Sequence, residues 1–266
     1  MISTHSITLV ASLFMLTACA STTVEPEPKP GHAILWAAYA AEYQAASMQV
    51  YAQATRDLPR LLSDESWSAL PGHEGTTGKP PAIILDVDET VTSSVDMELT
   101  MVPFSTIRQH EWGLSHKAIP VRGVAEFVAA ARELGVEIFF VTNRPCELLD
   151  GNPETCPQKQ ATANHIAEVG IETDSDHVLL ANEQHDWDRE KLTRREYIAR
   201  SHRIIMLFGD DYADFVACSR ANPRTPCTNV ATRASRLASL DTYKNYWGNG
   251  WYILPNPMYG SWTSVR

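Results

Sequence analysis

The stretch "AIILDVDETVTSS" (residues 82–94) places three acidic residues directly after a short apolar run. Residues 83–85 suit a buried strand, which would end at Asp86, Asp88 and Glu89. Side chains two positions apart in a strand point to the same face, so Asp86 and Asp88 would project together from its end. Like charges at that distance repel unless a cation or a shared proton relieves them. A solvated acidic loop is the alternative, and the rest of the chain must decide between the two.

Apolar runs and amphipathic segments alternate along the rest of the chain. After the first strand at 82–87, the pattern predicts strands at 136–143, 177–182 and 203–210, and helices at 121–135, 158–170 and 189–201. Nearly continuous apolar strands that alternate with helices are typical of a parallel sheet covered on both faces. We therefore expect an α/β fold, a Rossmann-like parallel sheet with helices on both faces. One long or two short helices are predicted within 33–62.

Length, composition and charge limit the classes of protein to consider. The 266 residues allow one large domain or two small ones, and 44% hydrophobic with 20% charged residues is ordinary for a globular protein. The formal net charge is −10 and no basic tract is present, which argues against binding to a nucleic-acid polymer. A small phosphate ester is not excluded, because a metal and one or two cationic side chains can hold it locally.

The N-terminus reads "MISTHSITLVASLFMLTACA" and has the character of an export signal. The apolar run at 7–18 is too short to span a bilayer but suits a signal peptide. Its end, "LTAC", resembles the lipobox of bacterial lipoproteins, which predicts a signal peptide at 1–18, a lipid on Cys19 and a polar tether at 19–32. A simple secreted protein is the alternative. Ala20 is not the Asp that favours inner-membrane retention, so we expect a lipid-anchored protein of the bacterial cell envelope, at the outer membrane.

Four further cysteines form two close pairs in Pro-containing segments, "CELLDGNPETC" and "CSRANPRTPC". Neither segment has the CxxC spacing or the nearby histidines of a zinc site. In an oxidising compartment they predict two disulfides, Cys146–Cys156 and Cys218–Cys227.

Polar side chains end one predicted strand after another, where ligands of such sheets bind. Asp86 can attack phosphorus and Asp88 can protonate the leaving alkoxide. Thr142 and Lys191 can hold the phosphoryl oxygens, and Asp210 adds a carboxylate for a cation. Ligation by oxygen alone suits Mg²⁺, so the residues predict phosphoryl chemistry with this metal.

These residues resemble a known family. "DVDET", "FVTNR", a lysine and "GDDYAD" resemble, in this order, the four motifs of the haloacid dehalogenase (HAD) superfamily. The helix "AAYAAEYQAASMQVYAQA" and the C-terminal "ILPNPMYGSW" resemble those of the class C acid phosphatases. Members of that family are bacterial surface lipoproteins that act as broad phosphomonoesterases and 5′-nucleotidases. The resemblance covers roughly residues 33–264.

The resemblance implies a role for each matching residue. Asp86 would be the nucleophile and a Mg²⁺ ligand, and Asp88 the general acid and base, binding the metal through its backbone carbonyl. Asp210 would be the third protein ligand, with Asp214 as a supporting carboxylate. The remaining roles fall to Thr142 and Asn143, which would contact the phosphoryl group, and to Lys191, which would neutralise it, with Arg194 and Arg195 as rivals for that role. Asp211 stands where Asn is common in the family.

A mainly helical cap over the site is also implied by the resemblance. One domain would span 33–266, with cap elements at about 33–65 and 93–118. Phe104 and Trp112 fall in the second of these and are candidates to stack a nucleobase, with packing of the cap as the alternative. Glu89 is expected to be a solvated or supporting acid.

The expected function is a Mg²⁺-dependent acid phosphatase. It would hydrolyse small phosphomonoesters, including nucleoside 5′-monophosphates, through an aspartyl-phosphate. A surface lipoprotein that binds a nucleotide or haem-like ligand without turnover is the main alternative. A phospho-acceptor signalling domain is disfavoured by the general acid at Asp88. The sequence leaves open whether the protein forms a homodimer.

Overall fold

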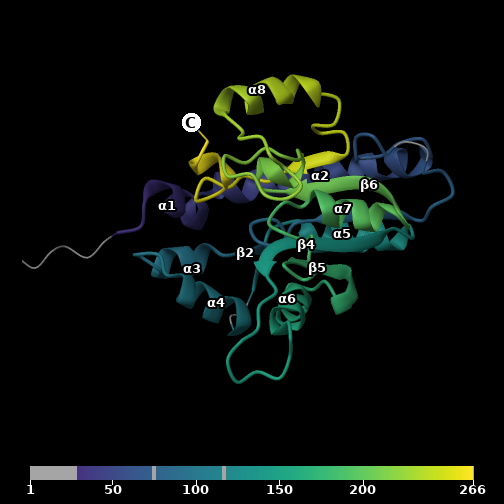
Figure 1. Ribbon diagram of the computed structural model, residues 1–266. Helices are drawn as coiled ribbons and strands as arrows, with labels where there is room; N and C mark the ends of the chain where they lie inside the picture. Colours follow the sequence, from purple (N-terminus) through teal and green to yellow (C-terminus); the bar gives the residue numbers. More distant parts are fainter. Residues whose placement is uncertain (1–28, 74–75, 116–117, 266) are drawn as a thin grey trace, which may run out of the picture.

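The fold is built on a five-stranded parallel sheet in the order β5-β4-β1-β6-β7 (Figure 1). The structure, a computed structural model, describes residues 29–73, 76–115 and 118–265. The sheet strands are β1 (Pro81–Leu85), β4 (Glu137–Pro145), β5 (Val178–Ala181), β6 (Arg203–Gly209) and β7 (Trp251–Ile253). This arrangement confirms the predicted α/β fold. The short edge strand β7 was not predicted from the sequence.

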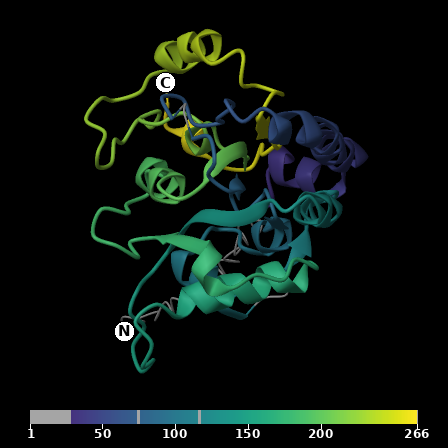
Figure 2. The same cartoon turned by 90° about the vertical axis from the view of Figure 1, so that its right-hand side faces the viewer.

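Helices cover both faces of the sheet (Figure 2). The helices are α1 (His32–Tyr39), α2 (Ala41–Ser63), α3 (Val95–Thr100), α4 (Thr106–Ser115), α5 (Val124–Glu133), α6 (Pro157–Glu168), α7 (Leu192–Ala199) and α8 (Arg233–Thr242). Helices α2, α5 and α6 pack on one face, and α7 packs on the other. The described residues also form the short 3₁₀ helices η1 (Ser175–His177), η2 (Tyr212–Asp214) and η3 (Ser261–Thr263).

Strand β1 lies at the centre of the sheet and is buried on both faces. It pairs in parallel with β4 on one side and β6 on the other. Because successive side chains alternate, Ile83 and Leu85 enter one core cluster while Ile84 enters the other. A continuous apolar run is what such a two-sided position requires, and it delivers the acidic segment to the carboxyl edge of the sheet.

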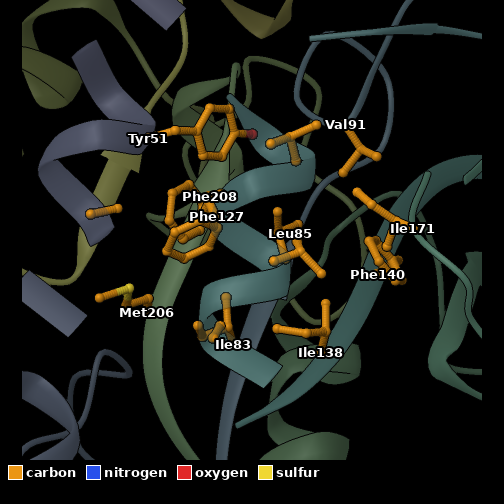
Figure 3. Packing of buried hydrophobic residues seen from close by; sticks show 14 of the residues in the cluster. Tyr51, Ile83, Leu85, Val91, Phe127, Ile138, Phe140, Ile171, Met206 and Phe208 are labelled. Carbon is orange, nitrogen blue, oxygen red and sulfur yellow. The ribbon is translucent and has the colours of Figure 1, made fainter. Parts of the chain in front are cut away.

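The core on the α2 side contains a group of aromatic rings (Figure 3). The ring of Phe208 lies 5.4 Å from that of Tyr51 and 4.7 Å from that of Phe127. The hydroxyl of Tyr51 also donates a 2.7 Å hydrogen bond to the carbonyl of Thr90, just beyond the acidic segment. The second half of α2 therefore packs in the layer that covers this face of the sheet. That 33–65 supplies cap elements stays a prediction.

The segment expected as the second cap element, 93–118, contains α3 and α4. It is bracketed by a two-stranded antiparallel pair, β2 (Thr92–Ser93) with β3 (Ile119–Pro120). Helix α1 packs against α3, and α4 packs against α6. In Figure 1, α1, α3 and α4 lie to the left of the sheet.

The termini and cysteines complete the description. The signal peptide at 1–18, the lipidation site Cys19 and most of the 19–32 tether lie outside the described residues. Within the described ranges, no helix has the length and apolar character needed to cross a membrane. The structure joins Cys146 to Cys156 and Cys218 to Cys227, which are the two pairings expected from the sequence.

Candidate active site

An ion-paired cluster lies at the carboxyl edge of the sheet, directly after β1. Asp86 is nearly buried, and its Oδ1 accepts a hydrogen bond from the Nζ of Lys191. Lys191 immediately precedes α7, and its Nζ also lies 2.7 Å from Oδ1 of Asp214 in η2. One buried ammonium group therefore bridges two carboxylates that come from different strand ends.

A third carboxylate, that of Asp210, joins this cluster from the end of β6. Asp86, Asp210 and Asp214 each offer an oxygen, and these atoms lie within 4.8 Å of one another. Burial raises the pKa of Asp86 to about 7, with the Lys191 ammonium opposing the shift and Asp214 and Asp88 adding to it. Burial likewise raises the pKa of Asp210 well above its usual value, and Asp86 and Asp214 contribute.

The donor set fits a divalent cation. The cluster has three carboxylates and one lysine, which pairs with two of them, so it carries more negative charge than its own residues neutralise. Hard divalent cations prefer carboxylate oxygens, and one bound here would remove the repulsion that disfavours ionised Asp86 and Asp210.

Gly209 makes the close approach within this cluster possible. A Cβ at this position would lie 2.4 Å from the Cβ of Asp214 and even closer to its Oδ2. Any other residue would push Asp214 away from Lys191. The absence of a side chain at Gly209 thus allows the carboxylate of Asp214, five residues later, to reach Lys191.

Asp88, the second acid of the opening motif, points away from this cluster towards Arg144 at the end of β4. Arg144 Nη2 lies 2.7 Å from Oδ1 of Asp88, and its Nε lies 3.1 Å from Oδ2. The side chain of Asp88 is 28% exposed, whereas that of Arg144 is 10% exposed. Arg144 also contacts Nδ1 of His165 at 3.0 Å. Arg144 is the last residue of the motif "FVTNR", and no role was assigned to it from the sequence.

Thr142 and Asn143 lie on the same strand end and are held from behind by Arg194. Arg194 is fully buried and donates hydrogen bonds to the carbonyl of Thr142 and, at 2.9 Å, to Oδ1 of Asn143. Thr142 is buried, and its Oγ1 accepts a 3.1 Å hydrogen bond from the backbone of Arg144. Sequence reasoning considered Arg194 as a rival of Lys191, but it lies behind the strand end and positions it.

The C-terminal segment "ILPNPMYGSW" (residues 253–262) contacts Asp210. Nδ2 of Asn256 donates a 2.7 Å hydrogen bond to Oδ2 of Asp210. Oδ1 of Asn256 in turn accepts from the backbone of Met258 at 2.9 Å and of Tyr259 at 3.4 Å. This contact gives "ILPNPMYGSW" a defined place at the site. The sequence signal for it was a polar residue between two prolines in an otherwise apolar and aromatic segment.

Asp211 stands where the family commonly has Asn, and it also binds the C-terminal segment, through Ser261. Its Oδ1 accepts from the backbone of Ala213 at 2.8 Å and so caps η2, and both of its oxygens accept from Ser261. Burial raises the pKa of Asp211, but the guanidinium of Arg220 and the hydrogen bonds from Ser261 and Ala213 together lower it by more, so the net shift is downward. Asp211 is thus an ionised structural acceptor.

Glu89 is fully buried, in contrast to the solvated acid that was one expectation. It has a positive φ of 60°, which turns the chain sharply after Asp88. Its carboxylate accepts from the backbone of Ser94 at 2.6 Å, from Tyr43 of α2 at 3.2 Å and from Tyr259 at 3.3 Å. Glu89 therefore joins the acidic motif to the first long helix and to the C-terminal segment.

A cavity of about 730 Å³ opens over these groups. Among the residues expected at the site, those in its wall are Asp86, Asp88, Trp112, Asn143, Lys191, Asp210 and Asp214. Trp112 lies in the wall beside Arg144, whose Cζ is 5.8 Å from the centre of its ring. Thr142 is not part of the wall. Phe104 is 59% exposed and lies apart from it, so its role in stacking a base stays a prediction.

Comparison with known proteins agrees with this geometry. The family model described as HAD superfamily, subfamily IIIB (acid phosphatase), matches residues 5–262. The class C acid phosphatase from Bacillus anthracis is similar in structure, with a TM-score of 0.68 and 26% identity over 86% of this chain and 84% of that chain. A second structure of it, with tungstate bound, gives a TM-score of 0.69 and 27% identity over the same shares. A search of curated protein sequences found no match.

The family match spans nearly the whole chain, and the fold and the cluster of strand-end residues are in accord with it. The expected resemblance is confirmed. The chain belongs to the HAD superfamily, subfamily IIIB, the acid phosphatases, and is a phosphomonoesterase.

Proposed function

We propose that this protein is a Mg²⁺-dependent acid phosphatase that hydrolyses small phosphomonoesters, including nucleoside 5′-monophosphates, through an aspartyl-phosphate on Asp86. The observation that carries the proposal is the cluster of Asp86, Asp210 and Asp214, with Lys191 paired to the first and the last, in the wall of a cavity. A carboxylate, a lysine and further acids at the ends of parallel strands form the set that phosphoryl transfer requires.

The reaction has two steps. In the first, an oxygen of Asp86 attacks phosphorus, the ester P–O bond breaks and protonated Asp88 gives its proton to the leaving alkoxide. In the second, Asp88 takes a proton from water, the water oxygen bonds to phosphorus and the bond to Asp86 breaks. Inorganic phosphate leaves, and Asp86 and protonated Asp88 are restored. Arg144 must release Asp88 for this cycle, because the two side chains are paired in the structure.

The other residues of the site bind and orient the phosphoryl group. Lys191 offsets its charge, and Asn143 lies in the cavity wall where its amide can donate to an oxygen. The metal, when bound, would neutralise charge on the phosphoryl oxygens, and Asp86, Asp210, Asp214 and the backbone of Asp88 are the groups proposed to hold it. Tungstate, bound in the Bacillus anthracis structure, is a tetrahedral oxyanion like phosphate, which supports the proposal that a phosphoryl group binds in this protein.

A nucleotide-sized substrate is supported by the cavity. Its volume of about 730 Å³ lies within the range of about 300–1,000 Å³ for small-molecule sites. Trp112 presents an aromatic surface in the same wall, and stacking of a base on it would contribute about 1–3 kcal/mol.

The test is phosphate release from a panel of phosphomonoesters, with Mg²⁺ and with EDTA, by the wild type and Asp86→Asn. We expect metal-dependent release that the substitution abolishes, while circular dichroism shows an unchanged fold. Substantial turnover by folded Asp86→Asn would contradict covalent catalysis by this residue. Ligand binding without release of phosphate from any ester would favour the alternative of a non-catalytic binding lipoprotein.

The proposed location is the outer membrane of a bacterial cell envelope, with a lipid on Cys19. The sequence "LTAC" followed by a polar tether supports it. Metabolic labelling with a fatty-acid analogue, compared between the wild type and Cys19→Ser, tests the anchor. Equal labelling of the two proteins would exclude Cys19 as its site.

A further inference from the structure

Three arginines gather in the wall of the active-site cavity, and no step of the proposed reaction uses them. Arg189, Arg220 and Arg224 all line the cavity that contains Asp86. Arg189 lies two residues before Lys191, and the other two belong to the loop closed by the Cys218–Cys227 disulfide.

The backbone holds this group of arginines, here called the arginine wall, in a defined place. Glu190 is buried, and its Oε2 accepts a 3.2 Å hydrogen bond from the backbone of Cys218, which ties the disulfide loop to the segment carrying Arg189. Within the loop, the carbonyl of Arg220 accepts from Ala231 at 3.0 Å and that of Arg224 from Cys227 at 2.7 Å. The guanidinium groups thus project from an anchored scaffold.

No acid in the described part of the chain forms an ion pair with the arginine wall. None of its three guanidinium groups has an ion pair within 4.0 Å or a side-chain hydrogen bond there. Nε of Arg220 is buried without a partner. Burial lowers the pKa of Arg189, the charges of Arg220 and Arg224 lower it further, and the charge of Asp188 opposes the shift without reversing it.

The two acids whose charges act on the wall, Asp188 and Asp211, also accept hydrogen bonds from other groups. Oδ1 of Asp188 accepts from the backbone of Arg189 at 2.6 Å, and both oxygens of Asp211 are taken by Ser261 and Ala213. Three like charges in one wall repel each other, and this repulsion is relieved when an anion binds between them. The chain has a net charge of −10 and therefore repels anions in general, whereas the arginine wall attracts them locally.

Guanidinium groups bind phosphate oxygens through paired hydrogen bonds, which makes arginine the preferred residue for phosphate recognition. In the proposed reaction the phosphoryl group under attack lies at Asp86 and Lys191, so an anion at the arginine wall would be a different part of the substrate.

We infer that the arginine wall binds a second phosphate of the substrate, so that the enzyme prefers phosphomonoesters that carry two phosphates, such as nucleoside 3′,5′-bisphosphates. This inference rests on the proposed function, since it places the first phosphate at Asp86. The cavity is large enough for one nucleotide, with the base, sugar and two phosphates all inside it.

The test separates binding from turnover. In the Asp86→Asn variant loaded with Mg²⁺, calorimetry measures dissociation constants for adenosine 5′-monophosphate and adenosine 3′,5′-bisphosphate. We expect the bisphosphate to bind at least about tenfold more tightly, in line with charge-assisted hydrogen bonds. The difference should shrink as salt rises, because charges about 10 Å apart are screened at 0.1 M.

Substitution then locates the second phosphate. Adding Arg189→Gln and Arg224→Gln, both at exposed positions, should remove the preference, and Arg220→Gln alone should reduce it. Arg233→Gln is the matched control, since Arg233 is exposed on α8 and lies outside the cavity wall. Melting temperatures identify any variant that fails to fold, and the two exposed positions keep the test valid if Arg220→Gln does so.

Each outcome has a separate meaning. Equal affinity of the two nucleotides, or a preference that survives the double substitution, would overturn the inference. Tight binding of the bisphosphate by Asp86→Asn, with no hydrolysis of any ester by the wild type, would overturn the proposed function and leave the second-phosphate site standing.

Discussion

Asn256 lies outside the four motifs, yet its position predicts control of metal binding. Its Nδ2 gives Asp210 a 2.7 Å hydrogen bond, and Asp210 is one of the three carboxylates that we propose to hold Mg²⁺. Burial raises the pKa of Asp210, so this donor supports the ionised form that a cation requires. In Asn256→Ala the donor is gone, and we expect weaker binding of Mg²⁺.

The magnitude follows from the contacts that are lost. A hydrogen bond to a charged group is worth about 1.5–3 kcal/mol, which corresponds to about a 10- to 100-fold change in a binding constant. Loss of a partner of a metal ligand commonly changes metal affinity by about the same factor. The backbone donors of Met258 and Tyr259 lose their acceptor as well, so we also expect a loss of about 1–3 kcal/mol in the free energy of unfolding.

The assay is phosphate release as a function of Mg²⁺ concentration, combined with urea denaturation. Asn249→Ala is the matched control, because Asn249 also makes side-chain hydrogen bonds, at 2.6 Å with Arg60 and 2.9 Å with Asn245, but lies outside the cavity wall. We expect the Mg²⁺ activation constant to rise about 10- to 100-fold in Asn256→Ala and to stay within twofold in the control. A folded Asn256→Ala protein with an unchanged activation constant would refute the argument.

Three further substitutions test other parts of the site. Asp88→Asn should slow hydrolysis of a nucleotide more than that of p-nitrophenyl phosphate, since a good leaving group needs little protonation; equal losses in kcat would count against the acid role. Gly209→Ala would place a Cβ 2.4 Å from the Cβ of Asp214, so we expect at least about 1–3 kcal/mol of destabilisation and loss of activity, against no effect for Gly31→Ala, where nothing lies within 4 Å. Tyr51→Phe leaves the carbonyl of Thr90 without its 2.7 Å donor and should cost about 1–3 kcal/mol in urea denaturation; a smaller change would mean that the loop after β1 is held by its other contacts.

The sequence predicted the parts of this fold that have a local pattern. Strands β1, β4, β5 and β6 follow from apolar runs, and the helices between them follow from helical spacing. Strand β7 has only three residues, too few for a period, and it exists because β6 offers it an edge. The break between α1 and α2 falls at Ala40, which is extended although neither Gly nor Pro is present. Contacts far along the chain, and not local propensity, determine both features.

The residues of the site likewise include some whose place could be predicted from the sequence and some whose place could not. Asp86, Asp210 and Asp214 could be placed together because parallel strands bring their carboxyl ends to one edge. Lys191 lies at the start of α7, and the resemblance to the family supplied its place in the site. Phe104 could not be placed in this way, because no strand end fixes its direction, and it lies in the open.

Glu89 illustrates why supporting contacts escape a reading of the sequence. Nothing local distinguishes a buried acid from a solvated one after Asp88. The nearby Ser94 donates to the carboxylate of Glu89, but two further donors come from far along the chain: Tyr43 lies 46 residues earlier and Tyr259 170 residues later. These neutral donors satisfy the carboxylate without adding a positive charge that would compete with Lys191 for the nucleophile. The fold thus anchors the acidic motif by hydrogen bonds from the first helix pair and the C-terminal segment, and keeps its buried ammonium group for Asp86 and Asp214.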